Sequence, residues 1–306
     1  MRCAYCGKEA KGTKEHIISC AILDLFPECY ITFDEARQAI HEADPKVKDV
    51  CADCNNNRIS YIDSYAKEFI SRYFTRKYNE DDTVEIEYDY VMIQKILLKY
   101  AFNDMRSHKE DCSFFNIEML DYLMNAGDNV PKENVTVLCG LAINVSPMPD
   151  AMFGNLKLRW CKDPFFYSNS TIRNIDYETG RVFLNEKVEK EEFPDLKLSY
   201  LFRFNSVQFL LMCWDKNSEK IEQNKVVLEY QYPYYLMKAN DEKAVLPLCT
   251  DEFNYHKYEH IHVRWDGLLG VGLMRKYASG GTYKDKESYE KEWVEEENRI
   301  KEKHPR

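Results

Sequence analysis

The stretch CADCNNNR, residues 51–58, holds two cysteines separated by two residues, followed by three asparagines and an arginine. A second pair with the same spacing occurs in CAYCG, residues 3–7, where Gly7 is placed to form a turn. Each Cys-x-x-Cys pair can form a tight knuckle, and two knuckles present four thiolates to one tetrahedral Zn²⁺. The spacing therefore predicts a zinc site made by Cys3, Cys6, Cys51 and Cys54.

Four thiolates saturate the coordination of a zinc ion, so a site of this kind is closed and leaves no position for a reacting water. We therefore expect the zinc to be structural and to hold residues 1–78 together as one module. Any hydrolytic chemistry in this module would need a second metal.

The segment KEHIIS, residues 14–19, lies between the two cysteine pairs. Glu15 offers carboxylate oxygens, which suit Mg²⁺ or Mn²⁺, and the His16 imidazole can take a proton from water near neutral pH. Asn55 follows the last cysteine and can offer an amide oxygen to the same metal. Neighbouring side chains on a strand point to opposite faces, so Glu15 and His16 can serve one site only where the strand ends or twists.

This array of cysteine pair, EHI, cysteine pair, asparagine and arginine resembles the HNH endonucleases of the ββα-metal type, in the subgroup clasped by a four-cysteine zinc. The resemblance covers residues 1 to about 70. It implies that Glu15 and Asn55 bind a catalytic divalent metal, that His16 is the general base, and that Arg58 contacts the phosphate of DNA.

One position departs from the family pattern. The middle asparagine of the motif, which helps to orient the histidine, would fall nine residues before Asn55, where this chain has Lys46. His16 must then be oriented by another group, such as a backbone carbonyl. Asp63 has two interpretations, as a carboxylate on the surface of a helix or as a group that orients Arg58 or a ligand.

Charge and cysteine content restrict the class of protein. The chain has 306 residues and a formal charge of -10, but residues 1–77 carry 12 Lys or Arg and 12 Asp or Glu, so the acidic excess lies downstream. This disfavours strong nonspecific DNA binding without excluding a local basic groove. Eleven cysteines in two close pairs and scattered singles do not resemble a secreted disulfide framework. With no apolar run long enough for a membrane span and no signal-peptide pattern at Met1, we expect a cytoplasmic protein without membrane partners.

The rest of the chain predicts an α+β protein. Apolar positions at intervals of three and four predict a helix from about 55 to 78 and a second from about 89 to 106, and a third follows at about 115–125. The last two form a helical connector over 79–126. Segments such as VTVLCGLAINV, GNLKLRW, RVFLN and SVQFLLMCW predict a β-rich domain over 127–283, and 284–306 predicts a charged helix.

These observations lead to one functional hypothesis and one alternative. The hypothesis is a metal-dependent DNA endonuclease that uses Mg²⁺ or Mn²⁺, with residues 127–283 acting as a regulator or as a surface for a protein partner or self-assembly. By analogy with other small nuclease modules fused to unfamiliar domains, it would be the effector of a prokaryotic anti-phage defence system. The alternative is a noncatalytic zinc module that binds nucleic acid or serves as a scaffold subunit.

Overall fold

The structure is a computed structural model that describes residues 1–27, 29, 32–34, 39–41, 44–79, 81–142, 157–162, 172–176, 181–184, 195–215, 234–249 and 295. The helical elements are α1 (Cys20–Leu23), the π-helical turn η1 (Cys54–Arg58), α2 (Ser60–Tyr73), α3 (Tyr90–His108) and α4 (Ile117–Met124). The strands of the first half are β1 (Gly12–His16), β2 (Thr32–Asp34), β3 (Ala39–His41), β4 (Lys46–Cys51) and β5 (Val84–Glu87). Those of the second half are β6 (Val135–Leu141), β7 (Leu158–Lys162), β8 (Ile172–Asp176), β9 (Arg181–Leu184), β10 (Leu196–Phe204), β11 (Val207–Trp214), β12 (Tyr235–Leu236) and β13 (Lys243–Leu246).

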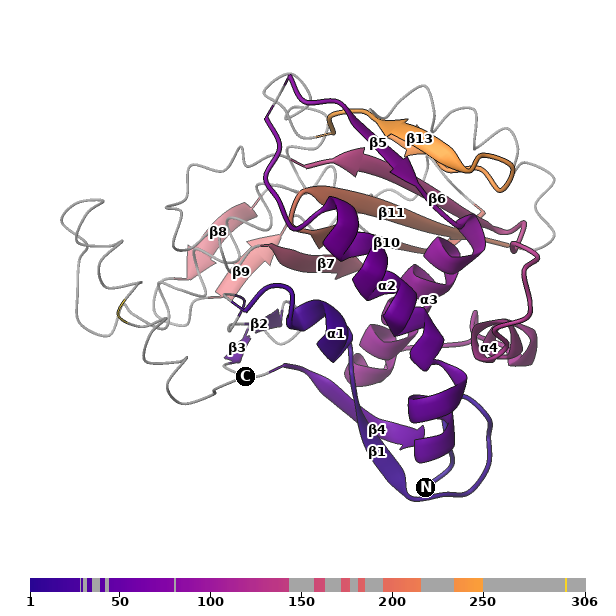
Figure 1. The fold of residues 1–306 in the computed structure, drawn as a ribbon. Coiled ribbons are helices and arrows are strands. Elements are labelled where there is room, and N and C mark those ends of the chain that lie inside the picture. Colours follow the sequence, from indigo (N-terminus) through magenta and orange to yellow (C-terminus); the bar gives the residue numbers. More distant parts are fainter. Residues whose placement is uncertain are drawn as a thin grey trace.

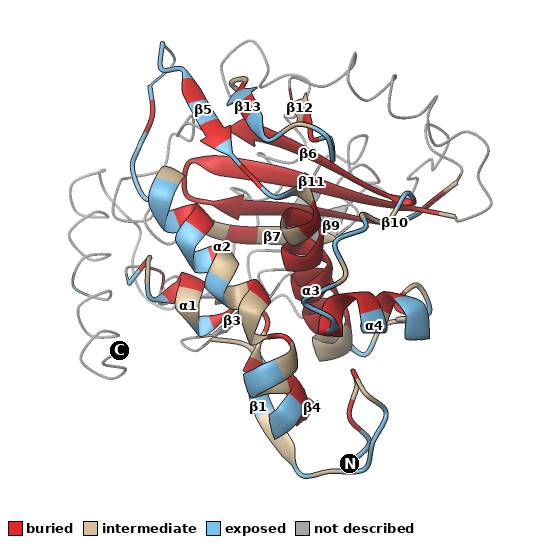
Figure 2. Ribbon diagram, turned by 45° about the vertical axis from the view of Figure 1, so that its right-hand side comes forward, coloured by how far each residue is buried: buried red, intermediate tan, exposed pale blue. Residues whose placement is uncertain are grey.

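The largest element is an antiparallel sheet with strand order β12-β6-β11-β10-β7. Figure 1 labels its strands β6, β11, β10 and β7, and Figure 2 labels β12. Its central strands β6 and β11 are buried along their whole length, because the residues of both faces lie in apolar surroundings. These strands match the predicted segments VTVLCGLAINV and SVQFLLMCW. Helices together with antiparallel strands agree with the predicted α+β class.

Asn205 closes the tight turn between β10 and β11. Its φ of 52° lies in the left-handed region, which asparagine tolerates better than most residues. Its side-chain amide donates to the carbonyls of Phe74 and Arg76, at 2.8 and 3.1 Å. The turn of the sheet is therefore bonded to the chain directly after α2.

Helix α3 lies at the centre of the molecule. It begins where the Asp89 carboxylate accepts the N–H of Met92, and it crosses the face of the sheet beside α2. Most of its residues are buried, as the red ribbon in Figure 2 shows. One apolar cluster includes residues of the first 78, of α3 and α4, and of the sheet. The division of the chain at residues 78 and 126 stays a prediction, and within the described residues the core runs across both positions.

The N-terminal region is built on the antiparallel pair β1–β4, which is followed directly by η1 and α2. A side chain at Gly12 would lie 2.2 Å from the carbonyl oxygen of Lys48, so only glycine allows the two strands to approach here. The register then shifts between Thr13 and Glu15, and His16 ends the strand opposite Lys46. The helix predicted over 55–78 is present, but it begins with the π-helical turn and ends at Tyr73.

Some predicted elements lie outside the described residues. Of the charged helix over 284–306 only residue 295 is described, and parts of the predicted β-rich domain, such as 216–233, are not described. Among the helices that the structure does describe, none combines the length and the apolar character needed to cross a membrane.

Candidate functional site

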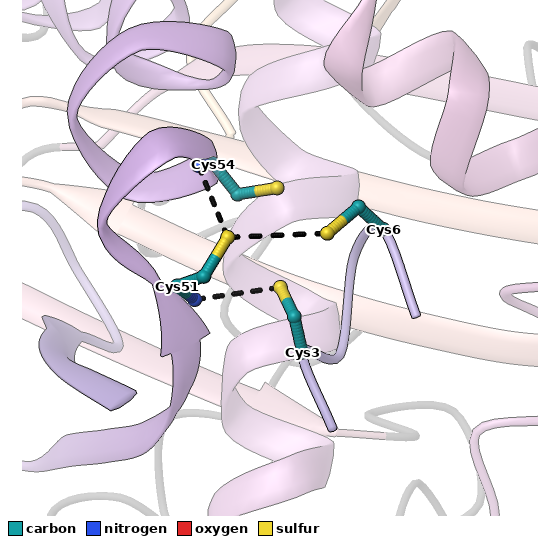
Figure 3. Close-up of side chains that lie close together, drawn as sticks. All are labelled: Cys3, Cys6, Cys51 and Cys54. Carbon is teal, nitrogen blue, oxygen red and sulfur yellow. Dashed lines mark hydrogen bonds between the residues drawn. The ribbon is translucent and has the colours of Figure 1, made fainter. Parts of the chain in front are cut away.

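The four cysteines predicted to bind zinc converge in the structure. Cys3 and Cys6 come from the N-terminal loop, Cys51 ends β4, and Cys54 begins η1 (Figure 3). Gly7, with a φ of 70°, allows the loop to fold back, and its N–H donates to the carbonyl of Cys3 at 2.9 Å. The predicted knuckle is therefore formed.

The geometry of this cluster fits one tetrahedral ion. The four sulfur atoms lie within 4.8 Å of one another, and a Zn–S distance of about 2.3 Å places tetrahedral ligands about 3.8 Å apart. Backbone N–H groups already point at two of the sulfurs, from Cys51 to Cys3 Sγ at 3.4 Å and from Cys54 to Cys51 Sγ at 3.5 Å. The cluster can therefore hold a zinc ion. Among the described residues it is the one group of His, Cys, Asp or Glu side chains close enough together to bind a metal ion.

Zinc binding should depend steeply on pH. Burial raises the pKa of Cys51 and Cys54, whereas at Cys3 the effect of burial is outweighed by backbone N–H donors, among them that of Cys51, which lower its pKa to about 7. Zinc binds thiolates, so Cys51 and Cys54 must each release a proton on binding, and protons compete more strongly as the pH falls. Affinity measured against a chromophoric chelator between pH 6 and 8 should drop by at least about 100-fold per pH unit as the pH falls, because these two thiols alone release two protons. An affinity independent of pH would contradict thiolate ligation.

Glu15, predicted as a metal ligand, is enclosed on the inner side of β1. Its side chain is only 3% exposed. Oε1 accepts a hydrogen bond from Asn103 Nδ2 at 3.1 Å and lies 3.3 Å from Lys99 Nζ, while Oε2 lies 3.5 Å from a guanidinium nitrogen of Arg106. With two cations already beside it, the carboxylate does not fit a ligand of Mg²⁺ or Mn²⁺ in this arrangement.

Two further carboxylates complete the network around Glu15. Each carboxylate oxygen of Asp63 in α2 accepts a hydrogen bond from Lys99, at 2.7 and 2.8 Å, and Asp49 of β4 pairs with Arg106. Burial raises the pKa of Asp63, and the nearby Lys99 ammonium opposes this rise. The Asp63 side chain is 24% exposed on α2, and its ion-pair partner is the buried Lys99 of α3 rather than Arg58; a role in orienting a ligand stays a prediction.

The stability of the network can be measured by a double-mutant cycle. Lys99→Met leaves the Asp63 carboxylate without its cation and the buried Glu15 carboxylate with Arg106 alone, at 3.5 Å, so we expect it to reduce the free energy of unfolding by about 3–5 kcal/mol. Because Glu15→Gln removes one of these charges, the double variant should lose less than the sum of the two single losses, by roughly 0.5–3 kcal/mol in urea titrations. Lys67→Met, at an exposed position of α2, is the control and should change stability by about 0.5 kcal/mol or less. Additive losses would mean that Glu15 and Lys99 do not interact.

His16, the predicted base, lies on the opposite side of the strand from Glu15. Its side chain is 18% exposed, and its Nε2 atom lies 3.5 Å from the sulfur of Cys20 and 3.9 Å from a carboxylate oxygen of Asp44. Lys46, which replaces the family's middle asparagine, is directly opposite His16 in the register and is exposed. The ring is thus accessible, with thiol and carboxylate groups close to it.

Asn55 and Arg58 both lie in η1, and Asn55 is bonded to the strand that ends at His16. The side-chain amide of Asn55 donates to Thr13 Oγ1 at 3.0 Å and to the carbonyl of Lys14 at 3.2 Å, which ties the start of the helix to β1. Arg58 is half-buried, and no carboxylate of the described residues forms an ion pair with it. The structure therefore ties Asn55 to the strand that ends at His16, while the carboxylate of Glu15 is turned inward.

Sequence reasoning missed a basic face on this hairpin. Lys14, Lys46 and Lys48 are exposed, and none pairs with a carboxylate within the described ranges. Directly opposite residues share one face of an antiparallel pair, as do residues two apart on a strand, so these lysines lie on the face of His16. The alternation of lysine and valine in KVK, residues 46–48, was the available signal.

The second missed feature is the set of polar residues on α3. Lys99, Asn103 and Arg106 are spaced by four and three residues, which places them on one face of the helix, and this face meets β1. The signal was a polar stripe in an otherwise apolar helix.

Comparison with known proteins adds no relative, because no family model, no curated protein and no solved structure matches this chain. The resemblance to HNH endonucleases therefore depends on the residues of the first module alone.

Proposed function

We propose that residues 1–78 form a nuclease module of the HNH type that hydrolyses phosphodiester bonds in DNA. The observation that carries the proposal is the ββα order: the antiparallel pair β1–β4 runs directly into η1 and α2, and the four cysteines join the hairpin to the start of the helix. This arrangement leaves His16 at the end of β1 on the open face.

The residues of this face suit a polyanionic substrate. Lys14, Lys46 and Lys48 provide three exposed ammonium groups on the strand face of His16, and the nearby turn η1 carries Arg58, whose guanidinium can bind phosphate through two hydrogen bonds. The imidazole of His16 would take the proton from the attacking water. The negative charge of the whole chain does not oppose this role, because the first 77 residues are balanced in charge and screening limits distant charges to a range of about 10 Å.

The proposal includes a catalytic divalent metal, and the test of the proposal varies the ion that is added. When bound, Mg²⁺ or Mn²⁺ would stabilise the charge that develops on the phosphate and the leaving oxygen. Glu15 could reach such an ion only after separating from Lys99 and Arg106. The role as an effector in anti-phage defence, controlled by residues 127–283 or by a partner, rests on analogy and is likewise part of the proposal.

A second candidate is a noncatalytic zinc module that binds nucleic acid or serves as a scaffold. It is favoured by one specific observation, the neutralisation of Glu15 by Lys99 and Arg106. The two candidates share the zinc site and the basic face but differ at His16.

Nicking of supercoiled plasmid decides between them. Wild-type protein and a His16→Ala variant are compared with Mg²⁺, with Mn²⁺ and with neither ion, after zinc content and folding have been checked for both. Cleavage that requires His16 supports the nuclease. Binding of DNA without cleavage, equal in the two proteins under every ion condition, supports the noncatalytic module.

A further inference from the structure

Asn103 of α3 is a fully buried residue that lies far along the chain from the nuclease module, yet it bonds to the strand of the histidine. Its exposed fraction is 0%. Its Nδ2 group donates to the main-chain carbonyl of His16 at 3.0 Å, with Glu15 Oε1 at 3.1 Å and the carbonyl of Ile17 at 3.4 Å as further acceptors. One amide group thus meets three consecutive residues centred on the proposed base.

The amide oxygen of Asn103 is also fixed. It accepts hydrogen bonds from the hydroxyl of Tyr5, at 3.0 Å, and from the guanidinium of Arg106. Tyr5 lies between the two cysteines of the first knuckle. Because both ends of the amide have partners, its orientation is determined. Asn103 of α3 thus connects the first knuckle to β1.

This contact lies at the end of β1, where the regular pairing with β4 stops. His16 is the last residue of β1, and beyond it the Ile17 N–H donates to the carbonyl of Pro45 at 3.1 Å before the chain turns into α1. One helical turn from Asn103, the hydroxyl of Tyr100 is 3.0 Å from that of Ser19. Helix α3 therefore holds the chain on both sides of His16.

We propose that Asn103 is a positioning residue that fixes the imidazole of His16 through its main chain. This inference rests on the proposed function of His16. It means that the geometry of the site depends on a helix outside residues 1–78. The side chain of His16 stands on a main-chain unit whose carbonyl is held, so loss of that bond allows the strand end to shift, and a shift of about 1 Å can reduce a rate by up to about 100-fold.

The neighbouring residue on the helix provides a matched control. Asp104 is also buried, but it accepts hydrogen bonds from Trp160 Nε1 at 2.8 Å and Tyr200 Oη at 2.9 Å, both in the large sheet. Asn103→Ala and Asp104→Ala each remove a buried polar group from adjacent positions of α3. Only the first removes a bond to His16.

The test first measures the position of His16 without any need for activity. In full-length, zinc-loaded protein with ¹⁵N-labelled histidine, the His16 ring signals are assigned with His16→Gln and titrated, and hydrogen exchange is followed in peptides covering residues 12–19. Asn103→Ala should shift the His16 signals and its titration midpoint and speed exchange in this segment. Asp104→Ala should leave His16 unchanged and speed exchange in β7 and β10. A His16 signal and an exchange rate that do not respond to Asn103→Ala would overturn the proposal.

Cleavage assays then examine the consequence for the reaction. Asn103→Ala should lower kcat by about 10- to 100-fold at unchanged DNA affinity, and it should cause no further loss in a His16→Ala background, because it acts through that histidine. A full, independent loss in that background would overturn the positioning role. If wild-type protein does not cleave DNA at all, the proposed function fails, while the spectroscopic arm still decides whether Asn103 fixes His16.

Discussion

His16→Ala is expected to lower the rate of DNA cleavage by about 10²–10⁴-fold, the usual contribution of a general base, while folding and zinc content stay as in the wild type. The fold should be retained because the ring of His16 is on the open face and the four cysteines are untouched. The measurement is single-turnover nicking of supercoiled plasmid over a range of Mg²⁺ and Mn²⁺ concentrations, with circular dichroism and zinc analysis of each protein.

Two control variants separate a chemical role from other effects. His108→Ala removes a histidine whose side chain is 16% exposed, close to the 18% of His16, but which lies at the end of α3, and it should leave cleavage within about twofold. Lys46→Asn changes the residue opposite His16; by removing one ammonium from the basic face it should weaken DNA binding at higher salt. Equal cleavage by wild type and His16→Ala, with both proteins folded and zinc-loaded, would contradict the nuclease.

The metal dependence of this cleavage tests the arrangement around Glu15. If Glu15 binds the ion, it must first leave Lys99, so Lys99→Met should lower the concentration of Mg²⁺ needed for half-maximal rate. If Glu15 is only a buried ion-pair partner, the requirement for Mg²⁺ should not change. A titration of Lys99→Met with Mg²⁺ therefore shows whether Glu15 binds the ion.

The cysteine cluster and much of the helical structure could be predicted because their signals are local. The spacing of Cys51 and Cys54 fixes a knuckle, and apolar residues at intervals of three and four identify α3. The environment of Glu15 could not be predicted in this way. Lys99 and Arg106 lie more than eighty residues further along the chain, and only the packing of α3 against the hairpin brings them to the carboxylate.

The burial of polar residues in α3, which lies in the predicted connector over 79–126, could not be predicted for the same reason. Polar residues at positions 95, 99 and 103 predict that this side of the helix is exposed, yet Lys95, Lys99 and Asn103 are all buried in the structure. Their partners are backbone carbonyls and carboxylates of distant segments, such as the carbonyls of Asn125 and Asp128 for Lys95. Burial of a polar side chain is tolerated when its hydrogen bonds are satisfied, and the sequence of one helix does not show those partners.

Cys54→Ser is expected to have the largest effect on stability. Structural zinc contributes an apparent binding free energy of roughly 10–16 kcal/mol in small modules, and Cys54 is one of the four cysteines that could hold a zinc ion between the N-terminal loop and the start of η1. Loss of this thiolate should abolish stoichiometric zinc binding. The N-terminal loop, β1 and β4 should then lose protection from hydrogen exchange, because the hairpin is a two-stranded sheet, and an isolated pair of strands is marginal in water.

The extent of unfolding tests how far the module depends on the metal. Helix α2 also packs on α3 and on the sheet through Phe69, so its second half should keep more protection than the hairpin. Cys139→Ser is the matched control, since Cys139 is fully buried in β6 and lies outside the cluster. It should cost about 1–3 kcal/mol for the buried hydroxyl while one zinc per chain is retained. If Cys54→Ser still bound one zinc per chain with the affinity of the wild type, the four-thiolate site would be wrong; if it lost the zinc but kept a protected hairpin, the metal would not be the element that holds residues 1–78 together.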